Sequence, residues 1–261
     1  MGVLEMFSLR GKVALVTGGA GLYGRQIVAA LAEAGAQTYV AARTLGPLEE
    51  VAATLRAQGH DVSALSYDQA QECSILALRD AILQRSGKID VLVNNAVLRP
   101  MHRGFTDEAA AFARSMEVNA TGLFIITRAM GNVMAEQGSG SIINIGSIQG
   151  MVGPDPTIYR GTEMHGWYPD YFFHKGGMIN FTRFVASYYG GRGVRCNCVS
   201  PGGFWRETMP EAFVRQYSDR TFLGRLANET DLMGIIVFLA SDASAYVTGA
   251  NIPVDGGYTA K

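Results

Sequence analysis

Cysteine is scarce in this sequence, and its scarcity limits what the protein can be. Only three cysteines occur among 261 residues, an odd number without regular spacing, which argues against a disulfide framework. Together with four histidines they supply too few ligands at the usual spacings for structural zinc, so we expect no metal site. Cys196 and Cys198 lie two apart in an expected strand, as two small buried residues on one face.

Net charge and long apolar runs are also lacking. The formal charge is -1, so no basic surface is available to hold a nucleic-acid backbone, and we expect no nucleic-acid partner. No segment approaches the length of a membrane span, and residues 1–12 contain no apolar run long enough for a signal peptide. These absences predict a soluble cytoplasmic protein with no membrane partner.

What the chain has is a regular alternation of short apolar runs and helical patterns. Hydrophobic residues make up 48%, enough for a large core. The expected strands are 12–17, 38–42, 62–67, 89–93, 141–145, 194–199 and 251–254. The expected helices are 23–34, 47–58, 74–85, one or two within 106–137, 171–189 and 231–241. This order predicts an α/β protein whose residues 1–261 form one Rossmann domain, a doubly wound parallel sheet of about seven strands flanked by helices.

A glycine-rich turn joins the first expected strand to the first helix. Gly18, Gly21 and Gly24 stand three apart, where a tight turn, a close backbone approach and helix-on-strand packing each disfavour a Cβ. The amides at the start of the helix would face a pyrophosphate. Turns collect glycine in any case, so the triplet alone is weak, but the flanking strand and helix supply the required context.

A tyrosine and a lysine stand four apart in the expected helix 171–189. Tyr171 and Lys175 would share one face, where the ammonium stabilises phenolate and lets the phenol exchange a proton with an alcohol near neutral pH. Ser147, after the fifth strand, can hydrogen-bond the same substrate oxygen, and Asn119 can hold a relay water near the lysine. Such a Tyr–Lys pair is common on helix surfaces, so its weight comes from the order and context of all four residues.

With these motifs the chain resembles the short-chain dehydrogenase/reductase family over nearly its whole length. The resemblance implies that Ser147, Tyr171, Lys175 and Asn119 are catalytic. The middle glycine, Gly21, falls one position earlier than in many members, with Leu22 in its usual place, as in the extended branch of the family. The segment Asn94-Asn95-Ala96 resembles a family motif that supports the sheet and lines the cofactor, with Val97 in place of a glycine.

The resemblance extends to the cofactor. Asp68 matches an aspartate that contacts adenine, although it could be an ordinary turn residue. The turn 197–203 resembles the family's Asn-x-x-x-Pro-Gly turn beside the nicotinamide. The expected cofactor contacts are Thr17, Gly18, Gly21, Leu22, Tyr23, Gly24, Ala42, Arg43, Asp68, Gln69, Asn95, Ala96, Tyr171, Lys175, Pro201 and Gly202.

The choice between NADP and NAD rests on the end of the second strand. An NAD enzyme usually carries an acidic residue there, which binds both ribose hydroxyls. This chain has Ala42 followed by Arg43, which could pair with a 2′-phosphate. NADP is therefore favoured over NAD, with a merely solvated Arg43 as the alternative.

Two further segments, an insertion and a flap, are expected near the substrate. Ser147 and Tyr171 lie twenty-four positions apart, more than is typical, so residues of about 149–170 form an insertion. Tyr159 and Tyr168 are rival tyrosines, but neither is followed four residues later by a lysine. The insertion would widen the loop over the substrate or, alternatively, form a subunit contact. Residues of about 203–223 would form a mobile flap.

The expected reaction is hydride transfer between NAD(P)(H) and a secondary alcohol or ketone, such as that of a sugar, polyol or sugar acid. A non-catalytic nucleotide sensor and an epimerase or dehydratase are the alternatives, although the short C-terminal part leaves no separate substrate domain. Guanidinium groups suit anions and aromatic rings stack on sugars, which predicts an anionic, sugar-like substrate. Loop arginines are often only solvated. The expected substrate contacts are Arg99, His102, Tyr159, Arg160, Trp205 and Arg206. The last strand resembles one that packs between subunits, implying a homotetramer or homodimer.

Overall fold

A parallel sheet of seven strands forms the centre of the computed structural model, which describes residues 2–261 and leaves only Met1 of the predicted domain outside. The strand order is β3-β2-β1-β4-β5-β6-β7, and every neighbouring pair is parallel. The strands are β1 Val13–Thr17, β2 Gln37–Ala42, β3 Val62–Ser66, β4 Val91–Asn94, β5 Gly140–Ile145, β6 Val194–Pro201 and β7 Asn251–Val254.

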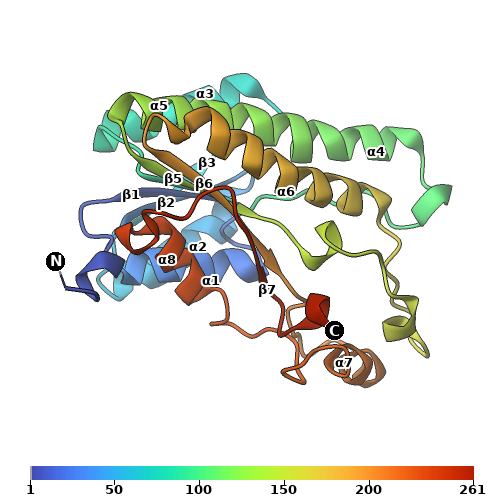
Figure 1. Ribbon diagram of the computed structural model, residues 1–261. Coiled ribbons are helices and arrows are strands. Elements are labelled where there is room, and N and C mark those ends of the chain that lie inside the picture. Colours follow the sequence, from blue (N-terminus) through green and yellow to red (C-terminus); the bar gives the residue numbers. More distant parts are fainter. Residues whose placement is uncertain (1) are drawn as a thin grey trace.

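Helices cover both faces of this sheet, as Figure 1 shows. One face carries α1 Leu22–Glu33, α2 Leu45–Ala57 and α8 Met233–Ala240. The other carries α3 Glu72–Ser86, α5 Leu123–Gln137 and α6 Pro169–Gly190, and α4 Ala109–Met116 packs beside α6. The short α7, Glu211–Ser218, lies apart from both layers beside the C-terminus. The predicted doubly wound α/β fold is confirmed.

The strand sequences are apolar because both of their faces are buried. In β5, neighbouring side chains point to opposite faces, so Ile142 packs with the α3–α5–α6 core and Ile143 with the α1–α2–α8 core. Both are 0% exposed, and each contributes roughly 1.5–3 kcal/mol by leaving water. The continuous apolar runs of the sequence thus come from helices on both sides.

The strand order reverses beside β1, and this reversal places the site. β2 lies on one side of β1 and β4 on the other, so the loops that follow β1 and β4 leave in opposite directions. A crevice opens at this point, outside the carboxyl ends of the strands. The glycine turn after β1 and the Asn95-Ala96 segment after β4 border it.

Element bounds differ by a few residues from the sequence-based expectation, and three differences concern the site. The helical stretch within 106–137 is interrupted by a π-helical turn, Glu117–Gly122, between α4 and α5. The helix α6 begins at Pro169 rather than at Tyr171, because proline suits the first turn of a helix. The flap contains a helix, α7, that the sequence analysis did not foresee.

Among residues 2–261, no helix combines the length and the apolar character needed to cross a membrane. Within the same range, no three His, Cys, Asp or Glu side chains gather closely enough to hold a metal ion.

Candidate active site

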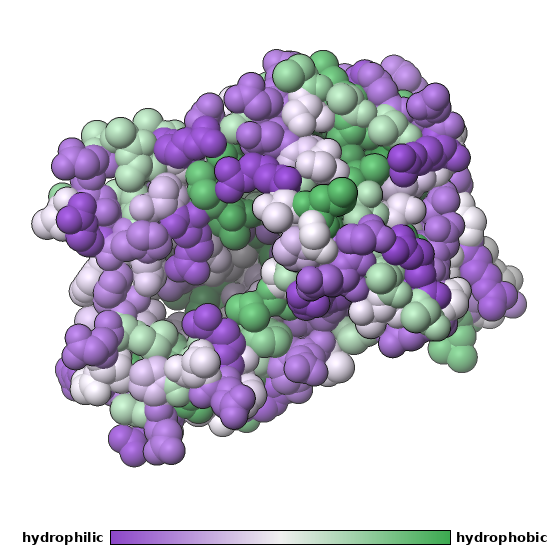
Figure 2. Space-filling view, turned by 180° about the vertical axis from the view of Figure 1, so that it is seen from behind, coloured by the Kyte–Doolittle hydropathy of each residue, from purple (hydrophilic) through white to green (hydrophobic). Residues whose placement is uncertain are grey.

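A cleft of about 470 Å³ lies at the carboxyl ends of the strands. Figure 2 shows the molecule hollowed on the side where the insertion and the flap lie, with hydrophobic residues on the walls. Of the predicted residues, the cleft brings together Gly18, Gly21, Leu22, Tyr23, Gly24, Asn95, Ala96, Ser147, Tyr171, Lys175, Pro201 and Gly202. Three of the predicted catalytic residues therefore share one cavity with most of the predicted cofactor residues.

The glycine turn is fixed by contacts that a Cβ would destroy. Gly18 has φ +66°, and a Cβ there would lie 2.8 Å from Cα of Ala96. A Cβ on Gly24 would lie 2.4 Å from the carbonyl oxygen of Gly18. Gly21 differs, since a Cβ would meet only that same oxygen, at 3.4 Å. Gly19, which the sequence analysis passed over, is more constrained, because its Cβ would lie 2.1 Å from Val40.

The Asn95-Ala96 segment is held against the glycine turn by Thr17. The Thr17 hydroxyl accepts hydrogen bonds from the backbone amides of Asn95 and Ala96, both at 3.0 Å. In return, Nδ2 of Asn95 donates to the carbonyl oxygens of Thr17 and Gly18. Thr17 is 0% exposed, so in this structure its hydroxyl supports the walls of the cleft and does not line it.

Three predicted catalytic residues come from two elements. Ser147 follows β5, and its hydroxyl accepts the amide of Gln149 at 3.1 Å. Tyr171 and Lys175 lie one turn apart on α6, with Nζ of Lys175 5.6 Å from the Tyr171 ring centroid. That ammonium donates to the carbonyl oxygen of Ile145, the last residue of β5. All three side chains line the cleft.

Burial and positive charge set the electrostatics around this pair. Burial lowers the pKa of Lys175, and the neighbouring Tyr171 partly offsets that effect. Burial, together with the charges of Lys175 and Arg99, lowers the pKa of His174 to about 3. His174 is therefore neutral at physiological pH. Its ring meets the Tyr171 ring edge-on, with centroids 5.2 Å apart.

Asn119 lies in the π-helical turn and is only 3% exposed. Its Oδ1 accepts the amide of Leu98 at 2.9 Å, and its Nδ2 donates to the Leu98 carbonyl at 2.6 Å and to Ser115 Oγ at 2.9 Å. The side chain is thus engaged with Leu98 and Ser115, and no hydrogen bond joins it to Lys175. Its role with a relay water stays a prediction. Turns of π-helix are frequent at functional sites.

A second cavity, of about 280 Å³, continues beyond the glycine turn. Ala42, Arg43, Asp68 and Gln69 line it, and no acidic residue stands at the end of β2. Asp68 Oδ1 accepts the amide of Ala70, which is the turn role considered as the alternative. The cradle at Gly18 and this extension fit a dinucleotide lying across both cavities.

The predicted substrate residues separate into two groups. Arg99, Tyr159 and Arg206 line the cleft. The structure leaves His102, Arg160 and Trp205 outside it, and Trp205 is 50% exposed. The Arg99 guanidinium carbon lies 4.5 Å from the ring centroid of Tyr171 and 4.6 Å from that of Tyr168. Among residues 2–261, no ion pair involves Arg99.

The flap contributes cleft residues that sequence reasoning missed: Met209, Phe213 and Tyr217. The spacing of Phe213 and Tyr217, four apart, is the pattern of a helix with one buried face, and it could have indicated α7. The flap packs on the insertion through stacked rings of Tyr159 and Phe213, an ion pair between Asp155 and Arg220, and a hydrogen bond from Gln216 to the Arg160 carbonyl.

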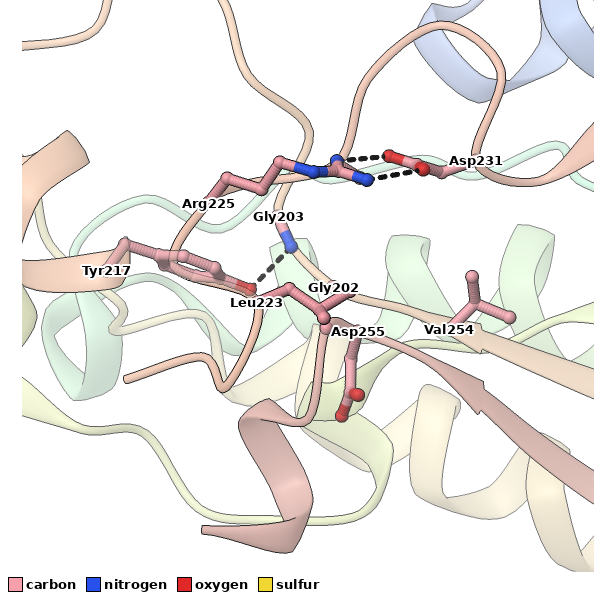
Figure 3. A pocket seen from close by; sticks show the side chains of 10 residues that line it. Gly202, Gly203, Tyr217, Leu223, Arg225, Asp231, Val254 and Asp255 are labelled. Carbon is pink, nitrogen blue, oxygen red and sulfur yellow. Dashed lines mark hydrogen bonds and ion pairs between the residues drawn. The ribbon is translucent and has the colours of Figure 1, made fainter. Parts of the chain in front are cut away.

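Figure 3 shows how the flap is anchored beside β6 and β7. The Tyr217 hydroxyl accepts the amide of Gly203 at 2.5 Å. Arg225 pairs with Asp231 through two hydrogen bonds of 2.6 and 2.8 Å, which hold the pKa of that carboxyl below its usual range. A cavity of about 70 Å³ lies between these contacts. Both anchors involve residues at or after the C-terminal end of α7.

A family model described as enoyl-(acyl carrier protein) reductase matches residues 21–259. The chain belongs to the short-chain dehydrogenase/reductase family. It is an NAD(P)-dependent oxidoreductase acting on CH–OH groups, as the sequence predicted.

Named relatives cover nearly the whole chain. It is 32% identical to galactitol 2-dehydrogenase (L-tagatose-forming) from Cereibacter sphaeroides, over 97% of both chains. It is 34% identical to cis-4-hydroxycyclohexanecarboxylate dehydrogenase from Sinomonas cyclohexanicum, over 95% of this chain and 97% of the relative. The crystal structure of a gluconate 5-dehydrogenase from Burkholderia cenocepacia in complex with NADP and tartrate matches over 100% of both chains, with a TM-score of 0.89 and 30% identity.

Proposed function

We propose that this enzyme oxidises a secondary alcohol of a polyhydroxylated, anionic, sugar-like molecule, or reduces the corresponding ketone, with NADP(H). The proposal that the substrate is anionic rests on the position of Arg99, inside the cleft beside Tyr171. Relatives named for galactitol, a hydroxycyclohexanecarboxylate and gluconate support a substrate with several hydroxyls or a carboxylate.

The side chains of the cleft divide the work on the substrate. Tyr171 Oη would give its proton to the carbonyl oxygen in reduction and take it back in oxidation. Ser147 Oγ would hydrogen-bond the same oxygen and orient it. Lys175 would stabilise the phenolate that remains on Tyr171. When bound, the nicotinamide supplies or accepts the hydride.

The chain also supplies the cofactor's binding surface. The glycine turn and the amides at the start of α1 would hold the pyrophosphate, and Asn95, Pro201 and Gly202 would border the nicotinamide. The Lys175 ammonium would also hold the ribose. The insertion 149–170 and the flap 203–223 would together close over the substrate, since the two segments pack on each other beside the cleft.

Arg99 provides the test of the anionic substrate. A charge-assisted hydrogen bond contributes about 1.5–3 kcal/mol, so Arg99→Ala should raise KM for a sugar acid roughly ten- to a hundredfold. KM for the neutral sugar should change little. Arg160→Ala, outside the cleft, is the matched control, and Arg206→Ala tests the second cleft arginine. If neither Arg99→Ala nor Arg206→Ala alters the preference between acid and neutral sugar, the proposal of an anionic substrate is wrong.

The cofactor preference rests on Arg43 at the end of β2. A 2′-phosphate would find the guanidinium of Arg43 where an NAD enzyme usually carries an acidic residue at the end of the second strand. We expect NADP(H) to bind more tightly than NAD(H), and Arg43→Ala to weaken NADP(H) alone. Fluorescence titration with both cofactors measures this, and tighter NAD(H) binding unaffected by Arg43→Ala would contradict it.

A homo-oligomer, as a dimer or tetramer, is the assembly that we propose. A row of exposed aromatic side chains runs along α5 and α6: Phe124, Phe173, Phe184 and Tyr188. The rings of Phe184 and Tyr188 stack, 6.0 Å apart, and both side chains are 60% exposed. A second copy of this chain would remove such a row from water.

A further inference from the structure

Two polar side chains beside Tyr171 have no part in the reaction described above. Asp170 and His174 stand four apart on α6, so they share one helix face, and they are 1% and 4% exposed. Among the described residues, Oδ1 of Asp170 and both ring nitrogens of His174 have no hydrogen-bond partner. Burying a carboxylate with so few partners is costly, so its remaining contact calls for an explanation.

That contact leads from α6 to the π-helical turn. The Ser115 hydroxyl donates to Oδ2 of Asp170 at 2.6 Å and accepts Nδ2–H of Asn119 at 2.9 Å. A serine hydroxyl can donate only one hydrogen bond. Because Ser115 donates it to Asp170, its oxygen must accept the hydrogen bond from Asn119. The direction of both hydrogen bonds is thereby fixed, and so is the orientation of the Asn119 amide.

The same amide holds the loop that carries Arg99. Asn119 bonds both the amide and the carbonyl of Leu98, the residue before Arg99. Arg99 in turn lies against the rings of Tyr168 and Tyr171, on either side of Asp170 in the sequence. The contacts therefore close a ring, from Asp170 through Ser115, Asn119, Leu98 and Arg99 back to the start of α6.

We propose that Asp170 and Ser115 are positioning residues, which fix the loop that carries Arg99 relative to the catalytic Tyr171. The ring ties the guanidinium that would bind the substrate's anionic group to the helix that carries the proton-transferring phenol. Breaking it at Ser115 leaves Asn119 bonded to Leu98 but removes the link from this pair to Asp170 on α6, and it changes no residue that would meet the substrate. The inference rests on the proposed anionic substrate for its kinetic part only.

The experiment compares Ser115→Ala with Ser141→Ala. Ser141 is equally buried and donates a comparable hydrogen bond, 2.7 Å to the Leu239 carbonyl, at the opposite end of β5. In Ser115→Ala we expect kcat/KM for the anionic substrate to fall roughly tenfold, because a displaced Arg99 would hold the substrate in a less productive position. The fall should be smaller for a neutral sugar. Ser141→Ala should change neither value beyond its effect on stability.

Hydrogen–deuterium exchange supplies a readout that needs no turnover. In Ser115→Ala, peptides covering 95–100 should exchange faster. Asn119 accepts the hydrogen bond of the Leu98 amide, and it would no longer be held by Ser115. Asp170→Ala should behave likewise, whereas Asp170→Asn keeps an acceptor for Ser115 and should preserve slow exchange.

The outcomes separate the two proposals. Unchanged exchange in Ser115→Ala and Asp170→Ala would overturn the ring, whatever the substrate. Faster exchange with equal kinetic losses in Ser115→Ala and Ser141→Ala would overturn its effect on catalysis. Faster exchange in an enzyme whose wild type does not distinguish acid from neutral sugar would leave the ring standing and refute the anionic substrate.

Discussion

The chemistry of the site depends on a few side chains whose surroundings differ sharply. Lys175 is fully buried against β5, whereas Arg99, close to the same tyrosine, is exposed in the cleft. The buried cation can act only on its immediate neighbours, while the exposed one is open to a ligand. His174, between Tyr171 and Lys175 in the sequence, is kept neutral by burial and by both cations.

Tyr171→Phe tests the proton-transfer role. The change removes one oxygen and keeps the ring that packs on Arg99 and His174. Turnover should fall by about 10²- to 10⁴-fold, the usual contribution of general acid–base catalysis, while cofactor affinity stays close to that of the wild type. Steady-state kinetics and cofactor titration measure both. Full activity here, with activity lost in Tyr168→Phe, would move the role to Tyr168.

His174 makes stability depend on pH. The folded pKa is about 3 and the ordinary value 6.5, so between these values the unfolded chain binds a proton that the folded chain does not. Stability contributed by the neutral ring is present above pH 6.5 and lost as pH falls. Between pH 7 and 5 the loss is up to about 2 kcal/mol.

Denaturant unfolding at pH 7 and pH 5 measures this dependence. In His174→Asn the difference between the two pH values should shrink by that amount. His102→Asn, which changes an exposed histidine, should keep the wild-type difference. An unchanged difference in His174→Asn would show that another group is responsible.

At the scale of elements, tight turns and helix ends decide where the cofactor fits. α1 begins within one residue of Gly21, directly against the glycine turn, and its start packs on that turn without room for another atom at Gly24. α7 and the insertion form a separate packed unit beside the cleft, centred on Phe213 and Tyr217. The glycine turn is held by close backbone contacts, whereas α7 and the insertion are held together by side chains.

Gly24→Ala should disturb the glycine turn. Its Cβ would lie 2.4 Å from the Gly18 carbonyl and 2.8 Å from Gly19, backbone atoms that cannot rotate away. The strain should cost about 1–3 kcal/mol of unfolding free energy and weaken cofactor binding. Gly46→Ala, in α2 with open space around its Cβ, should leave binding intact and leave stability unchanged or raised by up to about 1 kcal/mol. Equal effects of the two changes would contradict this assignment.

At the scale of the whole molecule, the parallel sheet gathers residues that are distant in the sequence. The strand order brings the ends of β1, β4, β5 and β6 to one edge, so that four connecting loops form one cleft. On α5 and α6, the aromatic row formed by Phe124, Phe173, Phe184 and Tyr188 remains exposed. The cleft and the proposed assembly surface are thus different surfaces of the molecule.

Phe184→Glu tests the assembly. A carboxylate in the centre of the aromatic row would have to be buried without a partner, which is unfavourable by several kcal/mol. Light scattering coupled to size-exclusion chromatography should show a dimer or tetramer for the wild type and a smaller species for the variant. Phe105→Glu, on a fully exposed side chain in another segment, is the control. A monomeric wild type would refute the proposed oligomer.

Short-range patterns in the sequence indicated the fold class, the glycine turn and the Tyr171–Lys175 pair, whereas Ser147 was expected from its place after the fifth strand and from the resemblance to the family. Apolar runs, glycine spacing and an i, i+4 pair depend on neighbours in the chain, so they can be recognised without coordinates. Element limits shifted by a few residues where a cap or a proline decided the end, as at Pro169.

Only the tertiary structure decided which polar residues meet. All the arginines predicted to bind the cofactor or the substrate lie in loops: Arg43, Arg99, Arg160 and Arg206. Sequence alone could not show that Arg99 and Arg206 line the cleft while Arg160 does not. Nor could it single out Ser115 and Asp170, since their contact joins residues 55 positions apart. Such pairings depend on how helices pack across the sheet, and this packing is set by the whole core rather than by any local pattern.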